Sequence, residues 1–402
     1  MISIDDVVAA RARIGRLVRN TPLMPSANLS ATTGVDLWMK LETLQVTGAF
    51  KERGAANCLL SLSDEARARG VVAASAGNHA QGLAINAQRL GVPATIVMPR
   101  FTPRVKVART RRYGADVVLH GDDYEAAAAH ARALCEARGA AFVHPFDDPA
   151  VIAGQGTLGL EVLEALDSLD AIVVPIGGGG LISGVALAIK ALRPSVEVIG
   201  VQSASFPSME RAFAQGSPTT VPGARTIAEG IAVKQTSPNT FAYVQRYVDD
   251  VIAVSEEEIA RAIVMLLEDE RVVAEGAGAA PLAAVLSGRL PRLIGKRVAL
   301  VVSGGNIDVN VVSNVIERGL VRVGRRARFH MIVPDRPGVL AEFSRIVAEQ
   351  GDNVLEIRHE RAFSKTAIGD AEVELFLDTA DFDDIATLKR RLEGLGYIVS
   401  ER

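Results

Sequence analysis

The stretch Thr47-Gly-Ala-Phe-Lys51-Glu-Arg-Gly54 places one lysine between a turn of small residues and a helix-like run over residues 52–60. A lysine withdrawn from water gives up its proton easily and becomes a nucleophile toward aldehydes. Three further turns rich in glycine, serine or asparagine each follow an apolar strand-like run, at residues 75–82, 177–184 and 303–306. We therefore interpret Lys51 as a candidate nucleophile beside a ligand site that these turns form.

The composition predicts a parallel α/β protein. The 402 residues are enough for two or three domains, and aromatic residues make up only 4% of them, whereas small and aliphatic residues abound. Aliphatic residues fill parallel sheets that helices cover on both faces. The net charge is −3 without a long basic block, so we expect neither nucleic acid nor a membrane surface as a partner.

We expect a cytoplasmic protein. Charged residues interrupt the N-terminal region, where a signal peptide has an apolar core. Residues 171–189 are uncharged, but Pro175 and four consecutive glycines would break a membrane-spanning helix there. Cys58 and Cys135 lie in helix-like runs without metal-ligand spacing, which indicates free thiols in a reducing compartment.

The order of apolar runs predicts two kinds of architecture. Over residues 70–144, strand-like runs alternate with helical runs, and this alternation predicts right-handed crossovers and an open, mainly parallel sheet. Similar alternation continues more slowly to residue 303, with residues 203–234 read as an irregular loop. The basic segment 321–328 is read as a linker. Residues 329–402 then follow the order βαββαβ, which is that of a compact ferredoxin-like unit.

The run Gly177-Gly178-Gly179-Gly180 follows a strand and begins a helix. Backbone N–H groups at a helix start bind anions, and glycines leave them accessible, so this loop suits one phosphate group. Close packing of a helix on a strand would need only one or two glycines. The dinucleotide fingerprint fails because Ser183 stands where a third glycine is required, and no Gly-Lys-Ser/Thr follows for a P-loop.

The other two turns offer hydrogen-bond donors. The segment Ser75-Ala76-Gly77-Asn78-His79 exposes backbone N–H groups at a helix start, where a carboxylate could bind. Asn78 is either a donor to a ligand or a helix cap, and for His79 a satisfied buried imidazole is the favoured interpretation.

Ser303 lies at a strand's end, where ligands of open α/β sheets gather. Its hydroxyl can bond a ring nitrogen without giving that nitrogen a charge. A nucleophilic lysine, a phosphate loop, a carboxylate site and a neutral hydroxyl together predict pyridoxal 5′-phosphate acting on an amino acid.

These four motifs, in this order over residues 1–320, resemble those of the threonine dehydratase (threonine ammonia-lyase) family. The resemblance implies the second fold type of pyridoxal-phosphate enzymes, which is similar to the β-subunit of tryptophan synthase. It implies two open parallel-sheet domains, a small one at about 42–145 inserted into a large one, 1–41 and 146–320. The linker 321–328 and a regulatory unit at 329–402 that resembles an ACT domain complete the chain.

The resemblance also implies a role for each matching residue. Lys51 matches the lysine that forms the Schiff base and later carries a proton, Asn78 the donor to the cofactor's 3′-oxygen, and Ser303 the partner of the pyridine nitrogen. Further cofactor contacts are implied for Phe50, Gly177, Gly178, Gly179, Gly180 and Leu181. Substrate contacts are implied for Ser75, Ala76, Gly77, Asn78 and His79, and Gly230 and Glu275 fall in segments that line the family's site.

The implied activity is β-elimination of the hydroxyl of L-threonine, which yields 2-oxobutanoate and ammonia, with L-serine as a further substrate. The resemblance also implies the first step of isoleucine biosynthesis, feedback by isoleucine countered by valine at the ACT unit, and a homodimer or homotetramer.

A serine dehydratase or racemase is the alternative within the class. Racemases of this fold resemble the same motifs but carry a serine where this chain has Ala76, and a carboxylate of their divalent-metal site corresponds to Gln202. We therefore expect poor racemisation and no metal there, while a monovalent cation remains open. Two other classes stay as alternatives: an inactive amino-acid sensor and a nicotinamide oxidoreductase, the latter weakened by the failed glycine spacing.

Overall fold

The computed structural model describes residues 1–361 and 366–401 and divides into two compact units, Met1–Asp308 and Val309–Arg402. Each unit has a hydrophobic core of its own. Within the described ranges, no helix is both long and apolar enough to cross a membrane.

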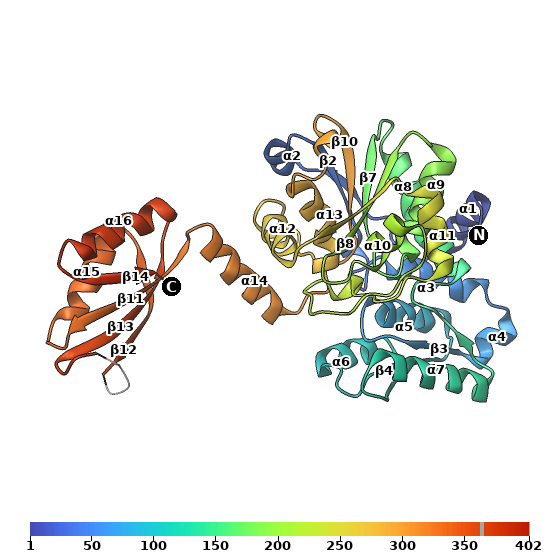
Figure 1. The fold of residues 1–402 in the computed structure, drawn as a ribbon. Coiled ribbons are helices and arrows are strands. Elements are labelled where there is room, and N and C mark those ends of the chain that lie inside the picture. Colours follow the sequence, from blue (N-terminus) through green and yellow to red (C-terminus); the bar gives the residue numbers. More distant parts are fainter. Residues whose placement is uncertain (362–365, 402) are drawn as a thin grey trace. The chain divides into compact units, whose positions relative to one another are not determined.

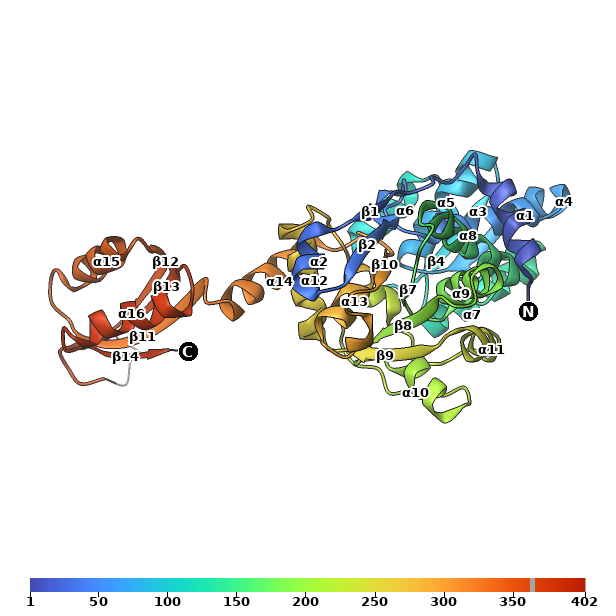
Figure 2. The same cartoon turned by 90° about the horizontal axis from the view of Figure 1, so that it is seen from above.

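The first unit contains a six-stranded sheet in the order β1-β2-β10-β7-β8-β9, which Figure 2 shows from one edge to the other. Its strands are β1 (Leu23–Pro25), β2 (Asp36–Leu41), β10 (Arg297–Val302), β7 (Ala171–Pro175), β8 (Glu197–Ser203) and β9 (Asp250–Val254). Only β1 runs antiparallel to its neighbour. Because β7 is apolar and buried along its whole length, it needs cover on both faces.

Helices on both sides provide this cover, and Figure 1 shows α9 and α13 on opposite sides of β7 and β8. The helices packed around this sheet are α1 (Ile4–Ile14), α2 (Ala27–Thr33), α8 (Pro149–Ala165), α9 (Gly180–Leu192), α10 (Ser208–Gln215), α11 (Pro238–Tyr247), α12 (Glu256–Glu268) and α13 (Gly276–Leu286). Short 3₁₀ turns lie at η1 (Glu42–Leu44), η2 (Glu229–Ile231) and η3 (Pro291–Leu293). Many helices start where the sequence provides a cap; Asp148, for example, accepts from the Val151 amide at the start of α8.

A second, four-stranded parallel sheet has the order β5-β4-β3-β6 and lies wholly within residues 42–145. Its strands are β3 (Val71–Ala74), β4 (Ala94–Met98), β5 (Asp116–Leu119) and β6 (Ala141–Phe142). The helices of this region are α3 (Lys51–Ser61), α4 (Asp64–Arg69), α5 (Asn78–Leu90), α6 (Arg104–Arg112) and α7 (Tyr124–Arg138). Side chains of α3 and α5 share a core with one face of the sheet and those of α7 with the other. The ribbon in Figure 1 shows α5 and α7 on opposite sides of β3. The predicted parallel α/β class is confirmed.

The segment 203–234 is not wholly irregular, because α10 lies within it. Gln202, at the end of β8, caps this helix: its Oε1 accepts from the amides of Met209 and Glu210 at 2.7 and 2.9 Å. The position compared with a metal-binding carboxylate therefore carries a helix-capping amide.

The second unit has the order βαββαβ after one preceding helix. Its elements are α14 (Val309–Arg322), β11 (Arg326–Pro334), α15 (Val339–Gln350), β12 (Asn353–Glu360), β13 (Asp370–Asp378), α16 (Phe382–Glu393) and β14 (Ile398–Glu401). The four strands form an antiparallel sheet in the order β12-β13-β11-β14, and its apolar face packs on the two later helices. The ferredoxin-like prediction is confirmed.

The domain boundaries differ from those expected. The helix α14 groups with the second unit, which begins at Val309, whereas residues up to 320 were assigned to the catalytic region. The expected linker 321–328 is largely structured, because Arg326, Ala327 and Arg328 extend β11 and pair with β13.

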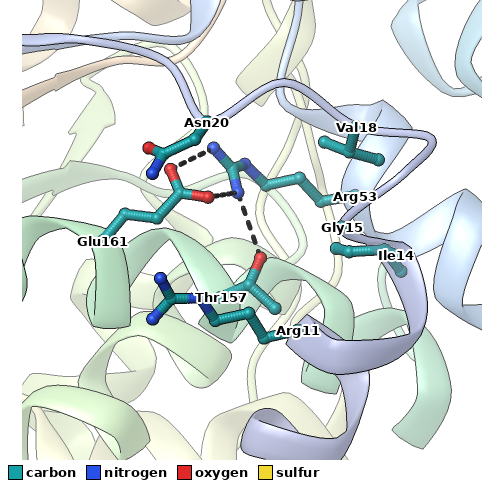
Figure 3. Close-up of a pocket in the computed structure, with 8 residues that line it drawn as sticks. All are labelled: Arg11, Ile14, Gly15, Val18, Asn20, Arg53, Thr157 and Glu161. Carbon is teal, nitrogen blue, oxygen red and sulfur yellow. Dashed lines mark hydrogen bonds and ion pairs between the residues drawn. The ribbon is translucent and has the colours of Figure 1, made fainter.

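A buried ion cluster joins α3 to the large sheet. The guanidinium of Arg53 donates to Glu42 at 2.7 and 2.8 Å and to Glu161 at 2.6 and 2.7 Å. Figure 3 shows Arg53 between Glu161 and Thr157, whose hydroxyl takes a further bond at 3.1 Å. Lys40 donates to Glu161 at 2.5 Å, so two cations and two carboxylates neutralise one another away from water.

We predict that Arg53→Leu lowers the free energy of unfolding by about 3–5 kcal/mol, because two carboxylates then stay buried without their partner. The control is Arg67→Leu, which removes an ion pair with Asp64, whose side chain is exposed. This change should cost less than about 1 kcal/mol. Denaturant unfolding measures both; equal losses would contradict a structural role for the buried cluster.

Candidate active site

Lys51 is the first residue of α3. Its Nζ donates to the carbonyl oxygen of Pro145 at 2.6 Å and lies 5.1 Å from the centre of the Phe50 ring. Burial lowers the pKa of the Lys51 amine to about 8, and the carboxylate of Glu275 opposes this shift. The amine is therefore neutral far more often than that of an exposed lysine.

The glycine loop lies between β7 and α9 and is closely surrounded. A Cβ atom on Gly178 would lie 2.4 Å from the Phe146 ring, and one on Gly180 would lie 2.6 Å from the Phe146 carbonyl oxygen. Gly179 has a φ of +91°, which side chains disfavour. The loop therefore tolerates only glycine, and the first N–H groups of α9, which no helical carbonyl can reach, are left for a ligand.

Leu181 and Gly177, for which cofactor contacts were also predicted, have different surroundings from Gly179. Leu181 is buried in the main core, so its backbone alone is available to a phosphate. Gly177 packs against the backbone at Gly230, because a Cβ on Gly177 would be 3.1 Å from the Gly230 carbonyl oxygen.

The turn after β3 leads into α5. Ser75 and Ala76 are partly exposed and Gly77 is exposed, with nothing within 4 Å of a Cβ placed on it. The Ser75 amide donates to the Val97 carbonyl oxygen at 3.1 Å, and the Gly77 amide donates to Ser75 Oγ at 3.2 Å. The Ser75 hydroxyl and the Ala76 amide therefore fit a substrate carboxylate best.

His79 points away from that turn. Its Nε2 lies 3.0 Å from the carbonyl oxygen of Val143, and its side chain is only 3% exposed. Burial, together with the charge of Lys51, lowers the pKa of His79 to about 3, so the imidazole is neutral. Its side chain is therefore part of the support for the site, and any substrate contact from this residue comes from its backbone.

Asn78, Glu275 and Gly230 come together. Asn78 Nδ2 donates to Glu275 Oε1 at 2.7 Å, and a Cβ on Gly230 would lie 3.4 Å from the same oxygen. Burial raises the pKa of Glu275 to about 7, while the bond from Asn78 acts in the opposite direction. Ser303 is buried where β10 ends, and its carbonyl oxygen accepts from the Phe50 amide at 3.0 Å.

Three participants were missed from the sequence. Pro145 supplies the carbonyl oxygen for Lys51, Phe146 packs on the glycine loop, and Asn306 Nδ2 donates to Asn78 Oδ1 at 2.9 Å. A signal for the first two was present, because they lie three and four residues after β6, and the carboxyl ends of parallel strands meet at one edge. Asn306 ends the turn 303–306, in which a role was predicted for Ser303 alone.

The residues present fit a phosphate-bearing aldehyde. The loop 177–180 has no room for side chains and points helix N–H groups outward, which suits a phosphate. Lys51 offers a desolvated amine for the aldehyde, and Asn78 offers an amide donor on the neighbouring loop. No carboxylate is needed for the ring nitrogen, since Ser303 provides a hydroxyl at the strand end.

Comparison with known proteins decides the family. Residues 14–304 match the family described as pyridoxal-phosphate dependent enzymes, and residues 331–396 match the ACT domain. An L-threonine ammonia-lyase of Thermotoga maritima is 51% identical over 399 residues, which cover 99% of this chain and 99% of that protein. This chain belongs to the threonine ammonia-lyase family.

Solved structures agree with this family assignment. The processed form of threonine deaminase isoform 2 from Solanum lycopersicum superposes with a TM-score of 0.75 at 36% identity, covering 78% of this chain and 86% of its own. Maize serine racemase gives a TM-score of 0.75 at 37% identity, covering 80% and 98%. The family is a group of pyridoxal-phosphate dependent lyases, so the predicted cofactor and enzyme class are confirmed. Because a deaminase and a racemase share this fold, only individual residues can distinguish elimination from racemisation.

We predict that the rate at which the cofactor-free protein takes up pyridoxal phosphate rises with pH and reaches half of its plateau near pH 8. Only the neutral amine of Lys51 attacks the aldehyde, and half of the amine is neutral at its pKa. Stopped-flow absorbance over a pH series measures this rate. A midpoint near about 10.4, the value of a solvated lysine, would contradict the desolvation of Lys51.

Proposed function

We propose that this chain deaminates L-threonine to 2-oxobutanoate and ammonia by β-elimination of its hydroxyl group. The observation that carries the proposal is Lys51, a desolvated amine at the meeting point of the strand-end loops. The near full-length similarity to a protein named L-threonine ammonia-lyase supports the choice of substrate.

Each loop has one task in this proposal. The turn 75–77 holds the substrate carboxylate through the Ser75 hydroxyl and the Ala76 amide, and the loop 177–180 holds the cofactor's phosphate. Bound pyridoxal phosphate withdraws electrons from the substrate and acidifies its Cα–H bond. The amine of Lys51 removes that proton, and the β-hydroxyl leaves as water. One water molecule then re-enters when the C–N bond is hydrolysed, so threonine yields the 2-oxo acid and ammonia.

Ser303 favours elimination over amino-group transfer. A carboxylate partner would hold the ring nitrogen protonated, whereas a hydroxyl leaves the ring a weaker acceptor of electrons. Negative charge then builds up less at Cα, and prompt loss of the β-hydroxyl is favoured.

Ala76 argues against racemisation. Reversal of configuration needs a proton donor on the face of Cα opposite Lys51, and a methyl group has no proton to give. We propose that L-serine is a second substrate for elimination, yielding pyruvate. In the cell we place the reaction in the cytoplasm, because Cys58 and Cys135 are free, and at the first step of isoleucine synthesis.

Release of 2-oxobutanoate from L-threonine by the purified protein tests this function. We expect release by the wild type and a loss of more than about a thousandfold in Lys51→Ala, because no other group replaces the amine. The control is Lys296→Ala, which lies just before β10, at the opposite end of the strand from Ser303. Bound cofactor without release from threonine would contradict the proposed substrate.

The ACT unit offers a site for a regulatory amino acid. The turn Asp335-Arg-Pro-Gly338 precedes α15, and Gly338 caps this helix with a φ of +96°. Helix N–H groups there fit the carboxylate of an amino acid. We propose isoleucine as the inhibitor, countered by valine, with ACT units pairing between subunits of a dimer or tetramer. Coupling between this site and the active site must then be reciprocal.

We predict that Gly338→Ala raises the isoleucine concentration for half-inhibition about five- to thirtyfold, because strain of roughly 1–2 kcal/mol opposes the turn that presents the N–H groups. Gly351→Ala is the matched control: it has a φ of +95°, caps the other end of α15 and has equally open surroundings. Threonine deamination at rising isoleucine measures both. Equal effects of the two changes, or no response of the wild type, would contradict the site.

A further inference from the structure

A chain of hydrogen bonds through side chains connects four segments of the active site. Asn306 Nδ2 donates to the Thr47 carbonyl oxygen at 2.6 Å and to Asn78 Oδ1 at 2.9 Å. Asn78 Nδ2 in turn donates to Glu275 Oε1 at 2.7 Å. The chain therefore starts at a backbone carbonyl and ends at a carboxyl group.

The two ends of this chain fix the orientation of both amides. A backbone carbonyl only accepts, so Asn306 must turn its NH₂ group toward Thr47. The second hydrogen of that group then needs an acceptor, which Asn78 Oδ1 provides. The NH₂ group of Asn78 is thus turned the other way, toward the oxygen of Glu275.

We propose that Asn306 is a positioning residue, which together with Glu275 holds the amide of Asn78 with its NH₂ group toward the cofactor's ring oxygen. One hydrogen of that group is bonded to Glu275, and the second is left for the ligand. The inference rests on the proposed contact of Asn78 with pyridoxal phosphate. An Asn78 amide turned by 180° would present an oxygen to the cofactor's oxygen and repel it.

The surroundings keep Asn306 in place. Its Oδ1 lies 3.0 Å from where a Cβ on Gly48 would be, and Gly48 has a φ of +74°. The backbone of the two loops is also joined, because the Gly305 amide donates to the Gly48 carbonyl oxygen at 2.9 Å. The loop that carries Asn306 is thus fastened to the turn that leads into Lys51.

A double-mutant cycle in cofactor binding tests the inference. Pyridoxal phosphate is titrated into the cofactor-free forms of the wild type, Asn78→Ala, Asn306→Ala and the double variant, followed by the visible absorption of the bound cofactor. We expect each single change to raise the dissociation constant about tenfold, the effect of losing one net hydrogen bond. The double variant should be no weaker than Asn78→Ala, because Asn306 acts through Asn78. The exposed Asn28, far from the site in α2, provides the control Asn28→Ala.

The outcomes separate two failures. If Asn78→Ala bound pyridoxal phosphate as tightly as the wild type, the proposed contact between Asn78 and the cofactor would be contradicted. The positioning role would be overturned if Asn78→Ala weakened cofactor binding but Asn306→Ala did not. It would also be overturned if the two losses of affinity added fully in the double variant. Either result would leave the proposed function intact.

Orientation is tested by a second pair of variants, whose thermal unfolding confirms that they are folded. Asn306→Asp cannot donate and draws the NH₂ group of Asn78 toward itself, so we expect weaker cofactor binding than in Asn306→Ala and a changed ratio of visible to near-ultraviolet absorption. Glu275→Gln retains an acceptor oxygen for the NH₂ group of Asn78, so we expect it to lose less affinity for the cofactor than Asn306→Asp. Equal affinity and equal spectra of Asn306→Asp and Asn306→Ala would overturn the inference.

Discussion

The position of α3 depends on one guanidinium held between two carboxylates. Arg53 is 1% exposed and Glu42 is fully buried, and Glu161 joins them from α8. Separating such charges without water leaves each of them unpaired, which costs several kcal/mol, so the helix cannot slide or rotate on its neighbours. Lys51 lies two residues before Arg53 on the same helix. The ion cluster therefore fixes the position of the backbone from which the Lys51 side chain extends.

Loops that follow strands of both sheets of the first unit meet at the site. The loops after β3, β7 and β10 carry Ser75, Gly177 and Ser303, and each brings backbone or side-chain donors to one place. Burial that lowers the pKa of Lys51 also raises the pKa of Glu275, so a weakly basic amine faces a weakly acidic carboxyl group. Few net charges then surround the reacting atoms. The ligands are therefore oriented mainly by the directions of hydrogen-bond donors and acceptors.

Local signals were sufficient for much of this architecture. The alternation of strands and helices, the four glycines and the βαββαβ order of the tail each follow from residues close together in the sequence. The helix α10 was missed because its cap is Gln202, which lies six residues before Ser208 and reaches the helix only through the fold. Phe146 and Asn306 were missed for the same reason, since their partners are distant in sequence. The start of β11 was misread because charged residues such as Arg326 look like a linker until β13 pairs with them.

The most direct test of the account is to identify the residue that carries the cofactor. Borohydride reduction of the cofactor-loaded protein fixes pyridoxal phosphate on the amine to which it is bound, and peptide mass spectrometry then locates it. The account predicts the added mass on Lys51 alone. Label on another lysine, such as Lys40 or Lys106, or no label on a protein that visibly binds the cofactor, would contradict it.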